Sequence, residues 1–203
     1  MNLEVKISKK LIPYKTSFKF LKNRVDSLKK QKGKDLMWIL EHPLTFTGGI
    51  RSKKSEILDK KIKIIETNRG GKITLHNPGQ KIIYFVLNLN NKKKDIRNLI
   101  KIIEISIIEF LRIYGIKSYA DKENIGIWVG GKKIAAIGIR VSQWIAYHGC
   151  SININNNLEH YKKIIPCGLD NNKITSVINE SKKELINIEK NLQKIFTKNL
   201  KNI

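Results

Sequence analysis

Cysteine, acidic residues and long apolar runs are all scarce in this sequence. Two cysteines among 203 residues cannot build a disulfide framework, so we expect reduced thiols in a cytoplasmic protein. Neither Cys150 nor Cys167 has enough Cys or His neighbours at zinc-ligand spacing, and no metal site is expected. No apolar stretch approaches the roughly 18 residues that span a bilayer, and the first residues lack a secretory apolar segment. The sequence therefore predicts no membrane association.

Acidic residues are outnumbered: 17 Asp and Glu stand against 40 Lys and Arg, for a net charge of +23. Such an excess favours a polyanionic or acidic partner. The basic residues are mainly Lys spread over the whole chain, and aromatic side chains are not interleaved with them as base stacking would require. We therefore expect an acidic protein partner and no nucleic acid, and keep a basic nucleic-acid-binding domain as an alternative.

No internal repeat and no Pro-, Gly- or Ser-rich linker divides the chain, so residues 1–203 are predicted to form one domain. Apolar residues spaced three and four apart predict helices over 18–28, 96–114 and 185–195, with Thr175 or Ser176 as a candidate cap near the start of the third. Segments typical of strands cover 35–43, 61–71, 71–77, 81–89, 126–129, 132–141 and 144–154. Gly130 and Gly131 suit a tight hairpin. Strands interrupted by helices predict an α/β or α+β fold with a mixed sheet and packed helices.

The stretch TNRGGKITLHNPGQ, residues 67–80, combines glycine turns with Arg69 and His76. Glycines let the backbone approach a ligand closely, Arg69 can hold an anion or a carbonyl group, and His76 can carry a proton. On spacing alone, a pair of β-turns with a solvated arginine and a satisfied histidine explains the segment equally well.

Two further segments place a lysine and a thiol in suggestive surroundings. Lys133 precedes the small residues Ala135, Ala136 and Gly138, which leave room for a substrate to lie along a strand. Cys167 lies between a proline and a glycine in a predicted surface turn, where its thiol would be open to attack. A nearby ammonium group would stabilise the thiolate. The alternatives are a solvated lysine and a buried small apolar residue.

Cys150 and its neighbours lie in an alternating strand pattern, WIAYHGCSINI. Packing is the expected role of Cys150. His148 and Gly149 are candidates for a polar group and a close backbone approach at a substrate wall, although a satisfied histidine in the core or at a sheet edge fits the pattern better.

Taken together, the blocks LEHPLTFTGG, RGGKITLHNPGQ, KIAAIGIR, YHGCSINI and IIPCGLDNNKITS, in this order over residues 39–177, resemble the bacterial octanoyltransferases of lipoate biosynthesis, the lipoyl(octanoyl) transferase family. The resemblance implies a fold like the catalytic domain of biotin and lipoate protein ligases. It also implies an acyltransferase that moves an octanoyl group from octanoyl-acyl carrier protein to a specific lysine of lipoyl domains, in 2-oxoacid dehydrogenase complexes and in glycine-cleavage H protein.

In that scheme Cys167, matched by PCG, attacks the thioester on the phosphopantetheine arm and becomes an acyl-enzyme. Lys133, matched by KIA, lowers the pKa of this cysteine. The implied substrate-binding residues are Arg69, Gly70, Gly71, Lys72, Ile73, Thr74, Leu75 and His76, then Ala136, Ile137 and Gly138, then Gly149, Cys150 and Ser151. The small residues fit an apolar tunnel for an eight-carbon chain, whose burial contributes about 0.8 kcal/mol per methylene.

The resemblance implies no bound cofactor, and we expect a monomer. An ATP-dependent lipoate-protein ligase on the same fold is the alternative enzyme, but it activates its acid as an adenylate and needs no nucleophilic cysteine. The sequence departs from the family pattern at Lys72 and Leu75, where Gln or Glu and an aromatic residue are usual, and at Asn77, which replaces a glycine. Cys150 stands where relatives often carry a larger apolar residue. These departures bear on the shape of the acyl site.

Overall fold

The computed structural model describes residues 2–90, 92–121, 123–166 and 173–203. The strands of the described chain are β1 (Leu3–Ile7), β2 (Asp35–Leu40), β3 (Thr45–Gly48), β4 (Ile64–Glu66), β5 (Thr74–His76), β6 (Gln80–Asn88), β7 (Tyr119–Ala120), β8 (Gly126–Val129), β9 (Lys132–Ser142) and β10 (Ile145–Asn153). The α-helices are α1 (Tyr14–Lys29), α2 (Ile96–Ile113), α3 (Val177–Glu180) and α4 (Ile188–Asn199), and short 3-10 turns are η1 (Lys54–Glu56), η2 (Leu158–Lys163) and η5 (Leu200–Asn202).

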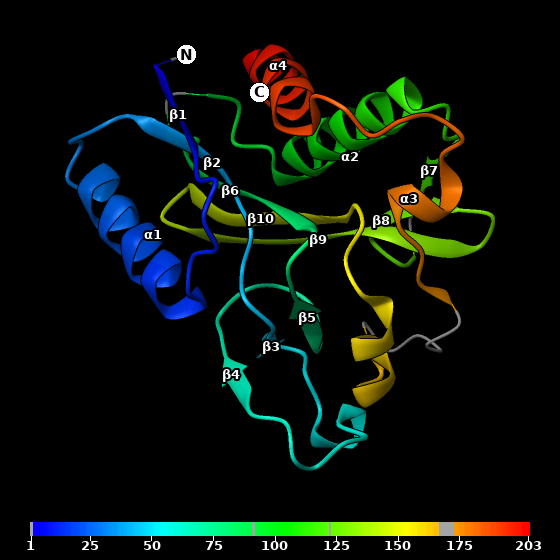
Figure 1. Cartoon of the computed structure of the whole chain (residues 1–203). Coiled ribbons are helices and arrows are strands. Elements are labelled where there is room, and N and C mark those ends of the chain that lie inside the picture. The colour runs from blue at the N-terminus through cyan, green and yellow to red at the C-terminus, as the bar shows by residue number, and fades with distance from the viewer. Residues whose placement is uncertain (1, 91, 122, 167–172) are drawn as a thin grey trace.

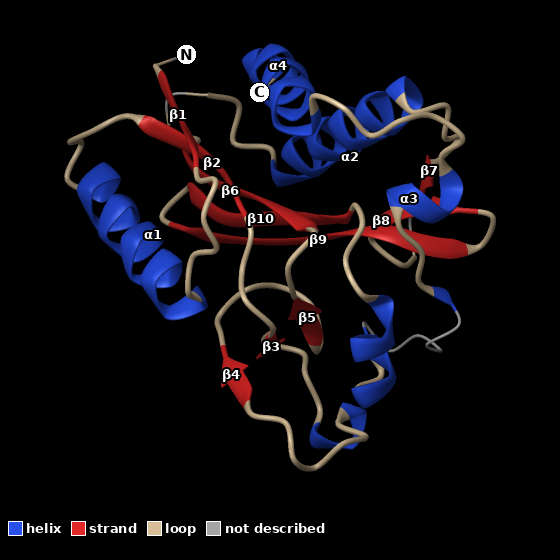
Figure 2. Ribbon diagram, viewed as in Figure 1, coloured by secondary structure: helices blue, strands red, loops and turns tan. Residues whose placement is uncertain are grey.

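The strands form two sheets (Figures 1 and 2). The larger has the order β1-β2-β6-β10-β9-β8-β7, and the smaller has the order β4-β3-β5. Strand β1 runs parallel to β2, and β3 runs parallel to β4, whereas the other neighbours are antiparallel. The predicted α/β fold with a mixed sheet is confirmed.

Helices α2 and α4 cover one face of the large sheet, while α1 and the small sheet lie on the opposite side (Figure 1). The side chains of strand β6 point alternately to the two faces of the sheet, and both faces are covered, so the strand is buried on both sides. Ile83, Phe85 and Leu87 belong to the core under α2 and α4, and Tyr84 and Val86 belong to the core under α1. A run of apolar residues without alternating polarity is therefore required in this strand.

Helix α2 follows the prediction closely. Its buried residues recur at helical spacing, and the side chain of Asp95 accepts a hydrogen bond from the Asn98 N–H at 2.9 Å, which satisfies an otherwise unpaired donor of the first turn. The helix ends before Gly115, whose φ of +75° suits a residue without a Cβ. The glycine hairpin is also confirmed, because β8 and β9 are joined by Gly130 and Gly131 at φ +54° and +77°.

The predicted third helix begins in the wrong place. Helix α4 starts only at Ile188, and Leu185 contacts the core from the irregular segment before it. Ser176 precedes the separate one-turn helix α3 instead, and the Thr175 hydroxyl donates to Glu180 at 2.6 Å. The periodic spacing misled because a buried side chain in an extended segment can contact the same core as a helix.

The first helix begins earlier than predicted, at Tyr14, with Pro13 at its N-cap position. Strands β1, β3 and β7 were not predicted; β1 and β7 are the edges of the large sheet, and they are short and little patterned. Among the helices in the described part of the chain, none combines the length and apolar character needed to cross a bilayer.

Candidate active site

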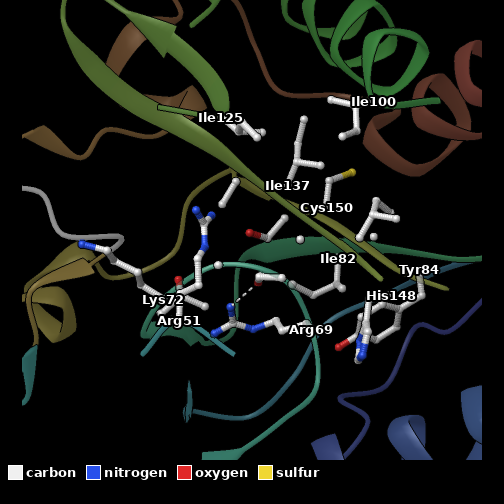
Figure 3. Close-up of a pocket in the computed structure, with 18 of the residues that line it drawn as sticks. Arg51, Arg69, Lys72, Ile82, Tyr84, Ile100, Ile125, Ile137, His148 and Cys150 are labelled. Atoms are coloured by element: carbon white, nitrogen blue, oxygen red, sulfur yellow. Dashed lines mark hydrogen bonds between the residues drawn. The ribbon is translucent and has the colours of Figure 1, made fainter. Parts of the chain in front are cut away.

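A cavity of about 590 Å³ lies beside strands β9 and β10 and the turn at residues 69–72 (Figure 3). This volume falls within the range of about 300–1,000 Å³ that is usual for small-molecule sites. The predicted site residues that line it are Lys133, Arg69, Gly70, Gly71, Lys72, Thr74, His76, Ala136, Ile137, Gly138, Gly149, Cys150 and Ser151. Segments from three of the five sequence blocks thus meet at one cavity.

Ile73 and Leu75 do not line this cavity. They are buried in a separate apolar core beneath the small sheet, together with Phe46, Tyr161 and Ile164. The reason is the alternation of side chains along an extended segment, which directs its even-numbered residues to the cavity and its odd-numbered ones away from it.

Small residues from two strands form one wall of the cavity. The register of β9 and β10 places Gly138 opposite Gly149 and Ala136 opposite Ser151. Gly149 is required for packing as well, because a Cβ at this position would overlap the carbonyl oxygen of Ile83 in β6. The predicted small-residue segment therefore becomes a continuous wall only through strand pairing.

The glycine turn is held by a second loop. The N–H groups of Gly49, Ile50 and Arg51 donate to carbonyl groups of residues 69–72 at 3.0–3.3 Å. A Cβ on Gly49 would lie 2.8 Å from Arg69 Nη1, so the two loops approach as closely as they do only because this residue is glycine. The carbonyls of the turn consequently face this loop.

The guanidinium group of Arg69 organises this same region. Its Nη2 donates to the Thr47 carbonyl at 2.8 Å and to the Thr47 hydroxyl at 2.9 Å, and Nη1 donates to the Gly70 carbonyl at 3.0 Å. Arg69 is 9% exposed. It reaches the cavity, and its hydrogen bonds link the turn to β3.

A chain of hydrogen bonds assigns the tautomer of His76. The Thr175 carbonyl can only accept, so Asn153 presents its Nδ2 to it at 2.9 Å. The Oδ1 of Asn153 then accepts from Gln80 Nε2 at 2.9 Å, which leaves Gln80 Oε1 facing His76 Nδ1 at 2.7 Å. His76 must therefore donate through Nδ1–H, and its Nε2 carries a lone pair.

Three buried histidines surround the inner end of the cavity and are uncharged at neutral pH. Burial lowers the pKa of His42 to about 4. Burial lowers the pKa of His76 to about 3, helped by His42. Burial, with the nearby Arg69, lowers the pKa of His148 to about 3.

Aromatic rings complete this inner end, and sequence reasoning missed them. Tyr14 of α1 stacks on His76 with ring centroids 5.9 Å apart, and the Tyr84 hydroxyl donates to His42 Nε2 at 2.8 Å. Figure 3 shows Tyr84 and His148 side by side. Tyr14 gave no signal because it lies more than 50 residues from the turn in sequence, whereas Tyr84 follows the alternation of its strand.

Lys133 is buried at 6% exposure near the start of β9, and its Nζ lies 5.5 Å from the ring centroid of Trp128. The ammonium group is thus in cation–π contact distance of the ring. Its carbonyl accepts from Thr175 N at 3.0 Å, and it forms a β-bridge with Ile174. A Cβ on Gly126 would collide with the Lys133 side chain, so the glycine makes space for it.

Cys167 lies outside the described residues, so its predicted pairing with Lys133 stays a prediction. The residues on both sides of the undescribed segment do lie beside the lysine: Pro166, Ile174 and Lys133 line a common small cavity. Ile165 is fixed as well, because its N–H donates to the Glu56 carbonyl at 2.8 Å.

Glu56 links this approach to the glycine turn. Its carboxylate is buried and lies 3.4 Å from Lys72 Nζ. The same carboxylate accepts from Lys53 N at 3.0 Å, which caps η1. Lys72, one of the departures from the family pattern, therefore joins the turn to the segment that leads toward Cys167.

Cys150 packs as predicted. It is 4% exposed within the core under α2, and burial raises the pKa of its thiol. In the ranges that the structure describes, the His, Cys, Asp and Glu side chains form no group suited to hold a metal ion.

Comparison with known proteins agrees with this picture. Residues 13–201 match the family of the lipoyl protein ligase A/B catalytic domain. The chain is 42% identical over 181 residues to an octanoyltransferase of Ehrlichia chaffeensis, covering 86% of this chain and 85% of that one. It is 38% identical over 191 residues to an octanoyltransferase of Bartonella tribocorum, covering 87% and 78%.

Solved structures show the same fold at low sequence identity. A bipartite lipoate protein ligase from Thermoplasma acidophilum gives a TM-score of 0.77 at 14% identity, over 99% of this chain and 84% of that chain. A biotin protein ligase from Aquifex aeolicus gives 0.53 at 15% identity, over 100% and 69%. The predicted ligase-like fold is confirmed, and the chain belongs to the lipoyl protein ligase A/B catalytic domain family, within which it is a member of the octanoyltransferases, a group of acyltransferases.

Proposed function

We propose that this protein transfers an octanoyl group from octanoyl-acyl carrier protein to a specific lysine of lipoyl domains, through a thioester on Cys167. The observation that carries the proposal is the meeting of Lys133, the glycine turn and the small-residue wall at one cavity, in a chain of the octanoyltransferase family. Pro166 and Ile174, on either side of the segment that contains Cys167, lie beside Lys133.

The reaction has two transfers. The Cys167 thiolate attacks the thioester carbonyl of the carrier, a new C–S bond forms, and the pantetheine thiolate leaves and takes up a proton. The neutral lysine amine of the lipoyl domain then attacks the enzyme thioester and loses a proton, an amide forms, and the Cys167 thiolate is released. Exchange of a thioester for an amide drives the second transfer forward.

In this scheme the Lys133 ammonium stabilises the Cys167 thiolate and takes part in the proton transfers of both steps. Its burial matters because a charge interaction is stronger where water is largely excluded. The Lys133 Nζ also lies 5.5 Å from the centroid of the Trp128 ring, whose face attracts an ammonium group.

The octanoyl chain would lie along the small-residue wall toward the inner end of the cavity. The tyrosines and the three neutral histidines add no charge to this end, and the nearby Arg69 guanidinium is already hydrogen-bonded to Thr47 and Gly70, which limits the cost of desolvation by an apolar chain. The backbone N–H groups of Gly70 and Gly71 donate to no other group in the described parts of the chain, and they are candidates to hold the oxyanion of the tetrahedral intermediate.

Partners follow from the same proposal. The acyl donor is acyl carrier protein, and the acceptors are the lipoyl domains of 2-oxoacid dehydrogenase complexes and glycine-cleavage H protein. The net charge of +23 would attract acidic partners and raise their association rates. The scheme needs no bound cofactor and no ATP, and we place the protein in the cytoplasm as a monomer.

Intact-mass spectrometry after mixing with octanoyl-acyl carrier protein, without ATP, tests the proposal. We expect an octanoyl increment on the peptide with Cys167 and none on the peptide with Cys150. Cys167→Ser should abolish both the increment and transfer to a lipoyl domain. Full activity of that variant would refute the mechanism, and activity that depends on ATP would favour a ligase.

Lys133→Ala tests the second residue. We expect it to raise the pKa of Cys167, measured from the pH dependence of thiol alkylation, because the stabilising ammonium is gone. An unchanged profile would remove Lys133 from the mechanism. Salt-sensitive RNA binding without any acyl adduct would instead support a nucleic-acid-binding domain.

A further inference from the structure

The charged side chains that line the cavity differ in the hydrogen bonds, ion pairs and ring contacts that they make with the rest of the chain. They are Arg51, Arg69, Lys72, Lys133 and Glu123. Arg69 is bonded to β3, Lys72 pairs with a buried glutamate, and Lys133 lies over a tryptophan ring. The side chain of Arg51 donates to no group in the described ranges of the chain. In the described ranges the Lys133 ammonium likewise donates to no group, but it is buried at 6% exposure, so Arg51 is the exposed cation of the cavity whose hydrogen bonds are available to a ligand.

Arg51 lies at the open end of the cavity. The exposed lining residues are Arg51 and Ile96 together with residues 123–125. The opposite end is closed, since Tyr84 is 5% and His148 is 2% exposed. Figure 3 shows Arg51 and Lys72 at one end of the cavity and Tyr84 and His148 at the other. The cavity thus opens beside the exposed side chains of Arg51 and Glu123, and neutral tyrosine and histidine side chains close its other end, next to the hydrogen-bonded Arg69.

The backbone holds Arg51 at this opening. Its N–H donates to the Gly71 carbonyl at 3.0 Å, and the neighbouring Ile50 N–H donates to the Arg69 carbonyl at 3.1 Å. Because these hydrogen bonds fix the main chain of Arg51 against the glycine turn, its side chain starts from a fixed position at the rim of the cavity.

We propose that Arg51 binds the phosphodiester group of the phosphopantetheine arm that carries the acyl thioester. This inference rests on the proposed function and identifies where its donor is held. The arm has an acyl chain at one end and a phosphate at the other, so placing the chain at the closed end directs the phosphate toward the opening. A planar guanidinium with several N–H donors matches a phosphate better than an ammonium does.

Binding measurements with two thioethers isolate the phosphate. S-octyl-phosphopantetheine and S-octyl-pantetheine differ only in that group, and neither carries a transferable acyl group. We expect the wild-type protein to bind the phosphorylated compound about five- to tenfold more tightly, because this compound alone can form a solvent-exposed charge-assisted hydrogen bond with Arg51. Arg51→Gln should abolish this preference, and Arg51→Lys should keep part of it.

The matched control is Arg112→Gln, which removes the same charge from the exposed last turn of α2, away from the cavity. It should retain the preference. The proposal is overturned if the wild type shows no preference, or if Arg51→Gln weakens both thioethers equally, which would assign Arg51 to the acyl part or to the loop. It is also overturned if the variant weakens only intact octanoyl-acyl carrier protein, which would indicate a contact with the carrier surface.

A separate arm distinguishes this proposal from the function on which it rests. Transfer from octanoyl-pantetheine and from octanoyl-acyl carrier protein to a lipoyl domain is measured with the wild-type protein. Absence of transfer from both donors refutes the proposed function, while the thioether binding still decides whether Arg51 recognises phosphate.

Discussion

Acid should unfold this protein well before its carboxylates are fully protonated, because three histidines are buried in neutral form. His42, His76 and His148 have pKa values of about 4, about 3 and about 3 in the folded protein, against about 6.5 in an unfolded chain. Folded pKa values below the unfolded value mean that the unfolded state binds protons first. The stability contribution is therefore complete above pH 6.5 and declines as the pH falls toward 3.

The magnitude follows from these pKa values. At pH 5 an unfolded histidine is almost fully protonated and a folded one is not, which lowers the free energy of unfolding by about 2 kcal/mol for each residue. Three residues give about 6 kcal/mol, a large part of the 5–15 kcal/mol that is usual for a domain. Protonating all three within the fold is unfavourable, because the His42 and His76 ring centroids are 5.5 Å apart.

Urea unfolding followed by tryptophan fluorescence at pH 7.5, 6.5, 5.5 and 5.0 measures this loss. His148→Asn removes one of the three groups, and asparagine tolerates the φ of +67° at this position. We expect its stability to fall by about one third less between pH 7.5 and 5.0. The control His160→Gln, the fourth histidine, should keep the wild-type loss. A stability that is flat over this range, or an unaltered loss in His148→Asn, would refute the reasoning.

Three other predictions test the packing around the site. Gly126→Ala should displace the Lys133 side chain and slow octanoyl transfer by at least about tenfold. Gly130→Asn in the same hairpin is the control and should stay active, because there is open space around Gly130. Equal transfer rates in the two variants would contradict the steric argument. Gly149→Ala should lower the free energy of unfolding by about 1–3 kcal/mol, because the added methyl overlaps a β6 carbonyl, and this loss is measured as a lower midpoint of urea unfolding. A wild-type midpoint would show that the strands can separate. Cys150 should resist alkylation at pH 8 until the protein is unfolded, because burial raises its thiol pKa, and peptide mapping of native samples would reveal any exception.

Much of the fold was predictable because local chemistry determines it. The periodicity of α2 needs an apolar face toward the sheet, and two consecutive glycines at 130–131 supply the positive φ of a tight hairpin. Errors arose where one local signal fits two structures. Leu185 has helical spacing from Ile188, yet its segment is irregular. Ile73 and Leu75 belong to a matched motif, yet strand alternation directs both away from the cavity.

The sequence by itself determined helix α2, the β8–β9 hairpin and the order of the motif blocks, and it led to the prediction that Cys167 and Lys133 form the reactive pair. These depend on residue type and near neighbours. Only the tertiary structure decided that Gly138 meets Gly149 in one wall, that Tyr14 closes the cavity and that Arg51 stands at its opening. The physical reason is that strand register and loop contacts join residues far apart in the chain, and no local pattern records which of them will meet.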